Sequence, residues 1–208
     1  MFENVDVDVP AGGLLVAHGP GGSGRTALLL ALCARMRLTT GVVQVGRDRA
    51  VGRGARRIQA RTAIARADAA VEPEGRLTVA ELIAEHRWSD RAVTTRAVAG
   101  AAWLLGLPLR GRTPAEDLDP LETLLLATAL ALACAPAVLA VDNVGRGCTR
   151  PQRERAWQAL RTVTDTGCTV LATATEPPPT DPGADTVLLA LPHRSAALLS
   201  PIGSQAQS

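Results

Sequence analysis

The sequence predicts an α/β fold with a mainly parallel sheet, and three stretches support this prediction. Residues 14–18 form an apolar run that breaks into glycines and then enters the strongly helical residues 27–34. Residues 137–141 form a β-branched run after an alanine-rich helical stretch, and residues 167–176 have the pattern of a further strand. Short buried strands that alternate with helices are typical of sheets covered by helices.

The other elements follow from apolar periodicity and from glycine and proline turns. The arginine-dense residues 47–66 are expected to form a solvated loop, with a docking patch for an anionic partner as the alternative. A disordered tail is expected at the end of the chain. In chain order we expect an edge strand over residues 5–9, a helix from 26 to about 37, strands over 40–46 and 62–67, helix from 78 to about 107 interrupted at Gly100 and Gly106, a polar helix over 153–161 and a final core strand over 185–191.

Composition indicates a soluble globular protein and excludes several function classes. The 208 residues are 47 % hydrophobic and carry a formal charge of +2, so nothing calls for nucleic acid as a partner. Aromatic residues make up only 2 %, which leaves few rings for base stacking. The four cysteines show no C-x-x-C spacing, and we expect free thiols in a reducing compartment.

One stretch has the length of a membrane span. Residues 123–141 carry no charge, but they contain Pro136, after which the helical pattern changes into a β-branched run. We therefore expect a buried helix, a turn and a central strand. The predicted location is cytoplasmic.

The glycine-rich stretch after residues 14–18 fits the phosphate-binding pattern G-x-x-x-x-G-K-[ST], with an arginine in place of the lysine. Glycines let the backbone turn several N–H groups toward phosphate oxygens, and the following helix adds its positive end. Thr26 is the expected Mg²⁺ ligand. The candidate nucleotide-binding residues are Gly19, Gly21, Gly22, Ser23, Gly24, Arg25 and Thr26.

Arg25 is the notable departure from this pattern. A lysine reaches the β- and γ-phosphates as a slim point charge, whereas arginine brings a wide planar fork. The chain contains no lysine, so compositional bias alone explains how the change arose. This compositional explanation does not give arginine the fit of a lysine around the γ-phosphate.

The strand that ends at Asp142, together with residues 118–122 at the spacing of a signature motif, resembles the nucleotide-binding domain of ATP-binding cassette (ABC) transporters. The resemblance implies that Asp142 holds Mg²⁺ through water. It also implies a three-layer P-loop NTPase fold with a RecA-like core, edge antiparallel strands and an inserted helical subdomain at about 78–135. The domain is expected to span residues 1–194, with 195–208 as the disordered tail.

Several positions depart from the family's motifs. Asn143 stands where the family has its catalytic glutamate, and Thr175 stands where it has the switch histidine. Asp68 lies in the region of the missing Q-loop glutamine. In the signature slot, Asp119 and Pro120 suit a helix start but oppose a phosphate held by a partner subunit. We expect loose binding of ATP or ADP with Mg²⁺, and slow or absent hydrolysis.

Three functions remain open at this point. The first is an ATP-binding subunit of a transporter, forming a homo- or heterodimer and working with a separate transmembrane permease at the inner face of the membrane. The second is a pseudo-ATPase module that pairs with an intact ATPase subunit. The third is another P-loop enzyme, such as a small-molecule kinase.

Overall fold

The computed structural model describes residues 2–66, 76–90, 93–179 and 183–192. Its central sheet has five strands in the order β4-β5-β6-β1-β7, and every neighbouring pair is parallel. This confirms the predicted α/β fold with a mainly parallel sheet. A separate antiparallel pair joins β2 (Gln44–Val45) to β3 (Asp48–Arg49). The strands of the central sheet are β1 (Leu14–His18), β4 (Thr62–Arg66), β5 (Val138–Val141), β6 (Thr169–Ala174) and β7 (Thr186–Ala190).

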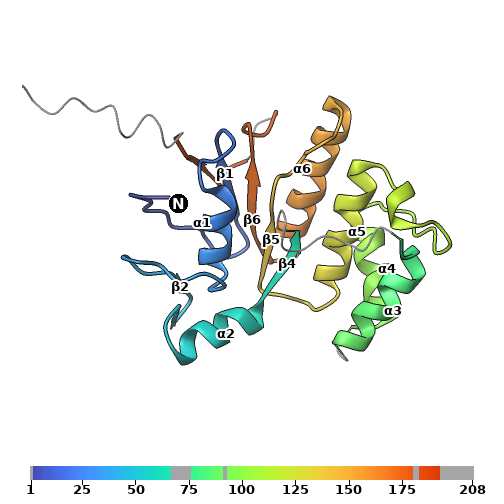
Figure 1. The fold of residues 1–208 in the computed structure, drawn as a ribbon, viewed down its shortest axis with the longest axis horizontal. Helices are drawn as coiled ribbons and strands as arrows, with labels where there is room; N and C mark the ends of the chain where they lie inside the picture. The colour runs from blue at the N-terminus through green and yellow to red at the C-terminus, as the bar shows by residue number, and fades with distance from the viewer. Residues whose placement is uncertain (1, 67–75, 91–92, 180–182, 193–208) are drawn as a thin grey trace, which may run out of the picture.

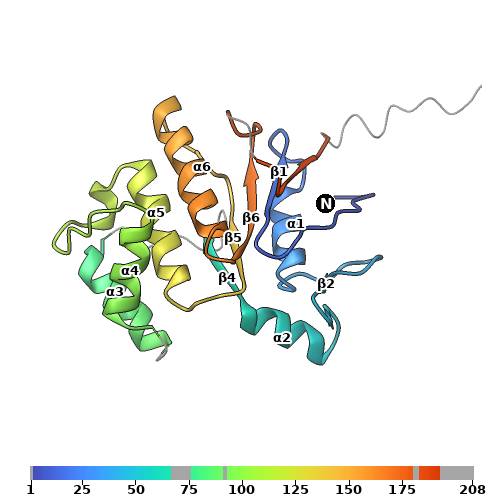
Figure 2. The same ribbon diagram turned by 180° about the vertical axis from the view of Figure 1, so that it is seen from behind.

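Helices cover both faces of this sheet and make three layers. Helix α1 lies on one face, where Leu29 packs with Leu15 and Leu171. Helices α3 to α6 lie on the other face, where residues such as Trp157 pack with Leu14. Figures 1 and 2 show α1 on one side of the strands, α5 and α6 on the other, and α3 and α4 outside α5. The helices are α1 (Arg25–Leu32), α2 (Arg53–Arg61), α3 (Val79–Ser89), α4 (Thr95–Leu104), α5 (Pro120–Leu132) and α6 (Arg150–Thr164), with a 3₁₀ turn η1 (Ala115–Asp117).

The topology brings three chain segments to one edge of the sheet. Strands β5, β6 and β1 are adjacent and parallel, so their carboxyl ends lie side by side. The residues that follow these ends are Asp142, Thr175 and Gly19. In open α/β sheets ligands bind outside the carboxyl ends of the strands. The polar residues of the sequence motifs therefore share this edge.

Helix α5 starts as its sequence predicts. The Asp119 side chain accepts a hydrogen bond from the Glu122 N–H, the Glu122 side chain accepts one from the Asp119 N–H, and Pro120 occupies the first turn. The apolar stretch at 123–141 is divided between α5 and β5, as expected. In the part of the chain that the structure describes, no helix is both long and apolar enough to cross a membrane.

The first quarter of the chain differs from the expected elements. Residues 5–9 form no strand, although their exposure alternates and Val7 and Val9 pack against the α1 side of the sheet. Their periodicity therefore reflects one half-buried face and not strand pairing. Helix α1 ends at Leu32, before the expected limit near residue 37, because Ala34 turns left-handed at φ 55. Of the strand expected at 40–46, only Gln44–Val45 forms.

Three further expectations need correction. The arginine-dense stretch is not a simple loop, because it contains helix α2, which buries Ile58. The helix expected from 78 to 107 is two helices: it breaks between Ser89 and Thr95, while Gly100 lies inside α4 and Gly106 follows its end at φ 66. The final strand, β7, is an edge strand in which no residue is fully buried, and not a core strand.

Some predictions are untested by the described residues. Asp68 and the tail at 195–208 lie outside them. Helices α3 to α5 fall within 78–135, but the limits of the domain and of a helical subdomain stay predictions.

The four cysteines are free, and the most deeply buried one gives a pH-dependent prediction. Burial raises the pKa of the Cys33 thiol from 9.0 to about 12, against a smaller lowering effect of Arg35. Above pH 9 the unfolded chain loses this proton and the folded chain keeps it, so stability falls as the pH rises toward 12. We expect Cys33 to contribute a loss of about 1.4 kcal/mol between pH 8 and pH 10 in urea unfolding. Cys33→Ala should lose this part of the pH dependence, and an identical slope in the variant would contradict the prediction.

Candidate functional site

The loop between β1 and α1 forms a cradle at the start of a helix. Gly24 precedes α1 in a left-handed conformation at φ 92, and no side chain caps the first turn. The N–H groups at this end of α1 are therefore left for an anion. Ser23 is buried, and its hydroxyl oxygen has no hydrogen-bond partner. A buried unpaired hydroxyl beside an uncapped helix start fits a loop that receives phosphate oxygens.

Across from this loop, Asp142 lies fully buried at the end of β5. The Thr26 hydroxyl donates to Asp142 Oδ2 at 2.6 Å, and the Thr173 hydroxyl donates to Asp142 Oδ1. A carboxylate and a hydroxyl side by side are oxygen donors of the kind that Mg²⁺ takes together with substrate phosphates. The structure thus brings together the two residues predicted to serve the metal, and their chemistry fits Mg²⁺.

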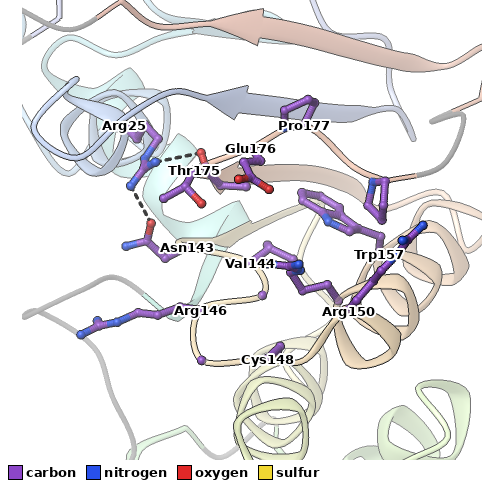
Figure 3. A pocket seen from close by; sticks show the side chains of 15 residues that line it. Arg25, Asn143, Val144, Arg146, Cys148, Arg150, Trp157, Thr175, Glu176 and Pro177 are labelled. Carbon is purple, nitrogen blue, oxygen red and sulfur yellow. Dashed lines mark hydrogen bonds between the residues drawn. The ribbon is translucent and has the colours of Figure 1, made fainter.

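Arg25 occupies the lysine position but is bound to the protein itself. Its Nη1 donates to the carbonyl of Gly19 and to the carbonyl of Ala174 at 2.9 Å, and its Nη2 donates to Asn143 Oδ1 at 2.9 Å. The side chain is almost completely buried. Figure 3 shows it reaching from the start of α1 toward Asn143 and the end of β6.

Asn143 and Thr175, which the sequence predicts to stand at degenerate catalytic positions, lie along one cavity of about 680 Å³ that Arg25 also lines. Asn143 has a left-handed backbone at φ 49, a conformation that asparagine tolerates better than most residues. Its amide oxygen can orient a water molecule but cannot take up a proton at neutral pH. Thr175 is exposed, and its hydroxyl has no basicity either.

The far end of this cavity approaches the start of α5. A Cβ on Gly147 would lie 3.4 Å from the Pro120 ring, so the loop after β5 packs closely on the start of α5, where the sequence predicts a signature slot. Burial, and then the charge of Asp119, raise the pKa of the nearby Cys148 thiol. Cys148 therefore stays a neutral thiol at physiological pH, and it brings no nucleophile to the cavity.

Sequence reasoning missed Thr173 and the carbonyl of Ala174. Thr173 is buried in β6, and its hydroxyl accepts from the Asn143 N–H at 2.9 Å while it donates to Asp142. It therefore fixes the carboxylate and the following backbone together. The signal was a hydroxyl residue that follows three apolar residues of the strand, beside the sheet edge where Asp142 was expected. No side-chain pattern could have revealed a backbone carbonyl as the partner of Arg25.

Parts of this chain are similar in sequence to curated ATP-binding proteins. No model of a known protein family matches the chain. The chain is 46 % identical over 57 residues to the cytochrome c biogenesis ATP-binding export protein CcmA of Pseudomonas syringae pv. tomato, covering 25 % of this chain and 27 % of CcmA. It is 26 % identical over 176 residues to the zinc import ATP-binding protein ZnuC of Ruegeria sp., covering 84 % of this chain and 65 % of ZnuC. The matches thus span less than two thirds of these curated relatives.

Solved structures share the fold over most of the chain. A dimeric structure of MJ0796, a bacterial ABC transporter cassette, superposes with a TM-score of 0.70 at 16 % identity and covers 93 % of this chain and 88 % of that one. CbiO1 from Clostridium perfringens, part of the ABC transporter complex cbiONQ, gives 0.68 at 14 % identity, covering 84 % and 72 %. These structures establish the fold, and the curated relatives add local sequence similarity. This chain therefore has the fold of the nucleotide-binding domains of ATP-binding cassette transporters, and parts of its sequence are similar to ATP-binding proteins of that kind.

Proposed function

We propose that this chain is an ATP-binding subunit of an ABC transporter that holds MgATP or MgADP in the loop between β1 and α1 and hydrolyses ATP slowly or not at all. The observation that carries the binding proposal is the contact between Thr26 and Asp142, opposite an uncapped helix start. Thr26 and Asp142 would hold Mg²⁺, and the residues of the loop would hold the phosphates. The metal, when bound, neutralises charge on the phosphate oxygens.

Slow hydrolysis follows from the groups around the loop. Neither Asn143 nor Thr175 can act as a general base, and loss of a base commonly lowers a rate by about 100-fold or more. Arg25 is committed to three acceptors of the protein. The hydrogen bond between Arg25 and Asn143 also supports a pseudo-ATPase role. In that role an intact ATPase subunit supplies a competent composite site.

The partners belong to the proposal as well. A dimer and a membrane permease are proposed from the printed descriptions of similar proteins, among them a dimeric cassette and a component of a transporter complex. The names of the two curated relatives differ in cargo and in direction of transport, so neither assigns a cargo to this chain. We propose a location at a membrane surface through such a permease.

Nucleotide binding and turnover can be tested on the purified protein. With MgATP or MgADP at about 100 times Kd, we expect a gain near 2.7 kcal/mol, which raises the melting temperature by about 5–10 °C. Phosphate release should stay near background, and Arg25→Lys combined with Asn143→Glu should raise it only partly. A wild-type turnover of about 1 per second or faster would contradict slow hydrolysis. No stabilisation by any adenine nucleotide would contradict the whole proposal.

A further inference from the structure

The side chain of Arg25 ties three separate parts of the site together. Its guanidinium donates to Gly19 in the loop after β1, to Ala174 at the end of β6 and to Asn143 after β5. All three acceptors are neutral oxygens. We name this set of contacts the Arg25 latch.

The three acceptors of the latch suit the hydrogen-bonding geometry of a guanidinium. A guanidinium offers several N–H donors in a fixed fork, so three acceptors in suitable places satisfy it without a carboxylate. Hydrogen bonds from a charged donor are stronger than those between neutral groups. The nearby Asp142 carboxylate accepts hydrogen bonds from the hydroxyl groups of Thr26 and Thr173. Opening the latch removes the guanidinium donor from two buried carbonyl groups, of which the Ala174 carbonyl still accepts from the Gly19 N–H at 3.2 Å.

By the resemblance to ABC nucleotide-binding domains, the latch lies beside the place expected for a third phosphate group. The resemblance assigns contacts with the β- and γ-phosphates to position 25, and it assigns the water next to the γ-phosphate to position 143. Arg25 and Asn143 already satisfy each other at 2.9 Å. A diphosphate held by the backbone of the loop can leave this contact in place. A triphosphate would bring a further charged group to this contact, and to bind Arg25 it would have to replace Asn143 and Ala174 as acceptors.

We propose that the Arg25 latch makes this site select a nucleoside diphosphate over a triphosphate, with Asn143 as the residue that sets the selection. The proposal rests on nucleotide binding by the loop, and it adds a preference among nucleotides. It also explains why two departures from the family's motifs occur together, because the arginine and the asparagine are hydrogen-bonding partners. Asn143 is here a specificity residue, and Arg25 changes from a phosphate ligand into a positioning residue.

The test measures Kd for ADP and for ATP, both with Mg²⁺, by isothermal titration calorimetry. For the wild type we expect ADP to bind at least as tightly as ATP. Asn143→Gly removes the acceptor, and glycine adopts the positive φ of this position freely. In this variant the freed Arg25 guanidinium should improve the affinity for ATP relative to that for ADP by about tenfold, the equivalent of one charged hydrogen bond. ADP affinity should stay unchanged.

Two controls separate the latch from a general effect. Arg96→Lys changes an exposed arginine at the start of α4 and should leave both affinities at the wild-type value. Melting of the nucleotide-free protein gives an independent readout: Arg25→Lys and Asn143→Gly should each lower the melting temperature, and the double variant should lower it by less than the sum.

The outcomes distinguish this proposal from the proposed function. If wild-type protein binds neither nucleotide, both proposals are wrong. If it binds nucleotides but the ratio of the two Kd values does not change in Asn143→Gly, only the latch is wrong. Wild-type binding of ATP more tightly than ADP, or strictly additive melting shifts, would also overturn the latch.

Discussion

Replacing Gly19 by alanine is expected to lower the melting temperature by about 6–12 °C and to abolish nucleotide binding. A Cβ at this position would lie 2.2 Å from the carbonyl oxygen of Leu191, which is backbone and cannot rotate away. The surrounding chain is fixed as well, because the Gly19 N–H donates to Ala174 and the Leu191 N–H donates to His18. Relieving the overlap has to move the loop or the end of β7, at about 3 kcal/mol.

Gly21 provides the matched control. It lies two residues further along the same loop, where a Cβ would meet no heavy atom within 4 Å. Gly21→Ala should therefore melt within about 1–2 °C of the wild type. Thermal melting followed by circular dichroism, with calorimetry for nucleotide binding, measures both effects. Equal melting temperatures for the two alanine variants would contradict the expected overlap between a Cβ at position 19 and the Leu191 carbonyl oxygen.

Asp142→Asn is expected to remove the Mg²⁺-dependent part of nucleotide affinity, a loss of about 10- to 100-fold. The amide keeps the size of the carboxylate but loses its charge, so it attracts a divalent ion far less. It also places an N–H₂ group against one of the two hydroxyl donors that the carboxylate accepts, which should lower the melting temperature of the free protein.

The measurement compares Kd for ADP with and without Mg²⁺ in the wild type and in the variant. Asp165→Asn removes an exposed carboxylate at the end of α6 and should keep the wild-type response to Mg²⁺. Asp142 would have no part in metal binding if Asp142→Asn kept the full Mg²⁺ enhancement. A variant that lost ADP affinity equally with and without the metal would point to a purely structural carboxylate.

Much of the fold could be predicted from local sequence. The strand β1, the break at Pro136 between α5 and β5, and the helix start at Asp119 all follow from residues that decide conformation within a few positions. The errors occur where local sequence is ambiguous. Alternation at residues 5–9 is the pattern of a strand, but a strand needs a partner, and this segment has only a half-buried face. The arginines of α2 concealed a helix because only Ile58 and Gly54 are buried in it.

For the candidate site, the sequence singled out the residues but could not assign their partners. Motif spacing predicted that the loop from Gly19 to Thr26 and Asp142 belong to one site. It predicted that Arg25 would fit the phosphates poorly and that Asn143 would lack basicity. It did not predict that these two residues bind each other, or that Thr173 holds Asp142.

The sequence by itself determined the glycine loop, the helix that follows it and the chemical nature of each residue at the site, because these depend on backbone freedom and functional groups at fixed spacing. The tertiary structure alone decided which oxygen atoms Arg25 meets. Those atoms come from residues 19, 143 and 174, which only the parallel order of β5, β6 and β1 brings to one edge. Two of them are backbone carbonyls, which every residue carries, so no side-chain pattern could distinguish them.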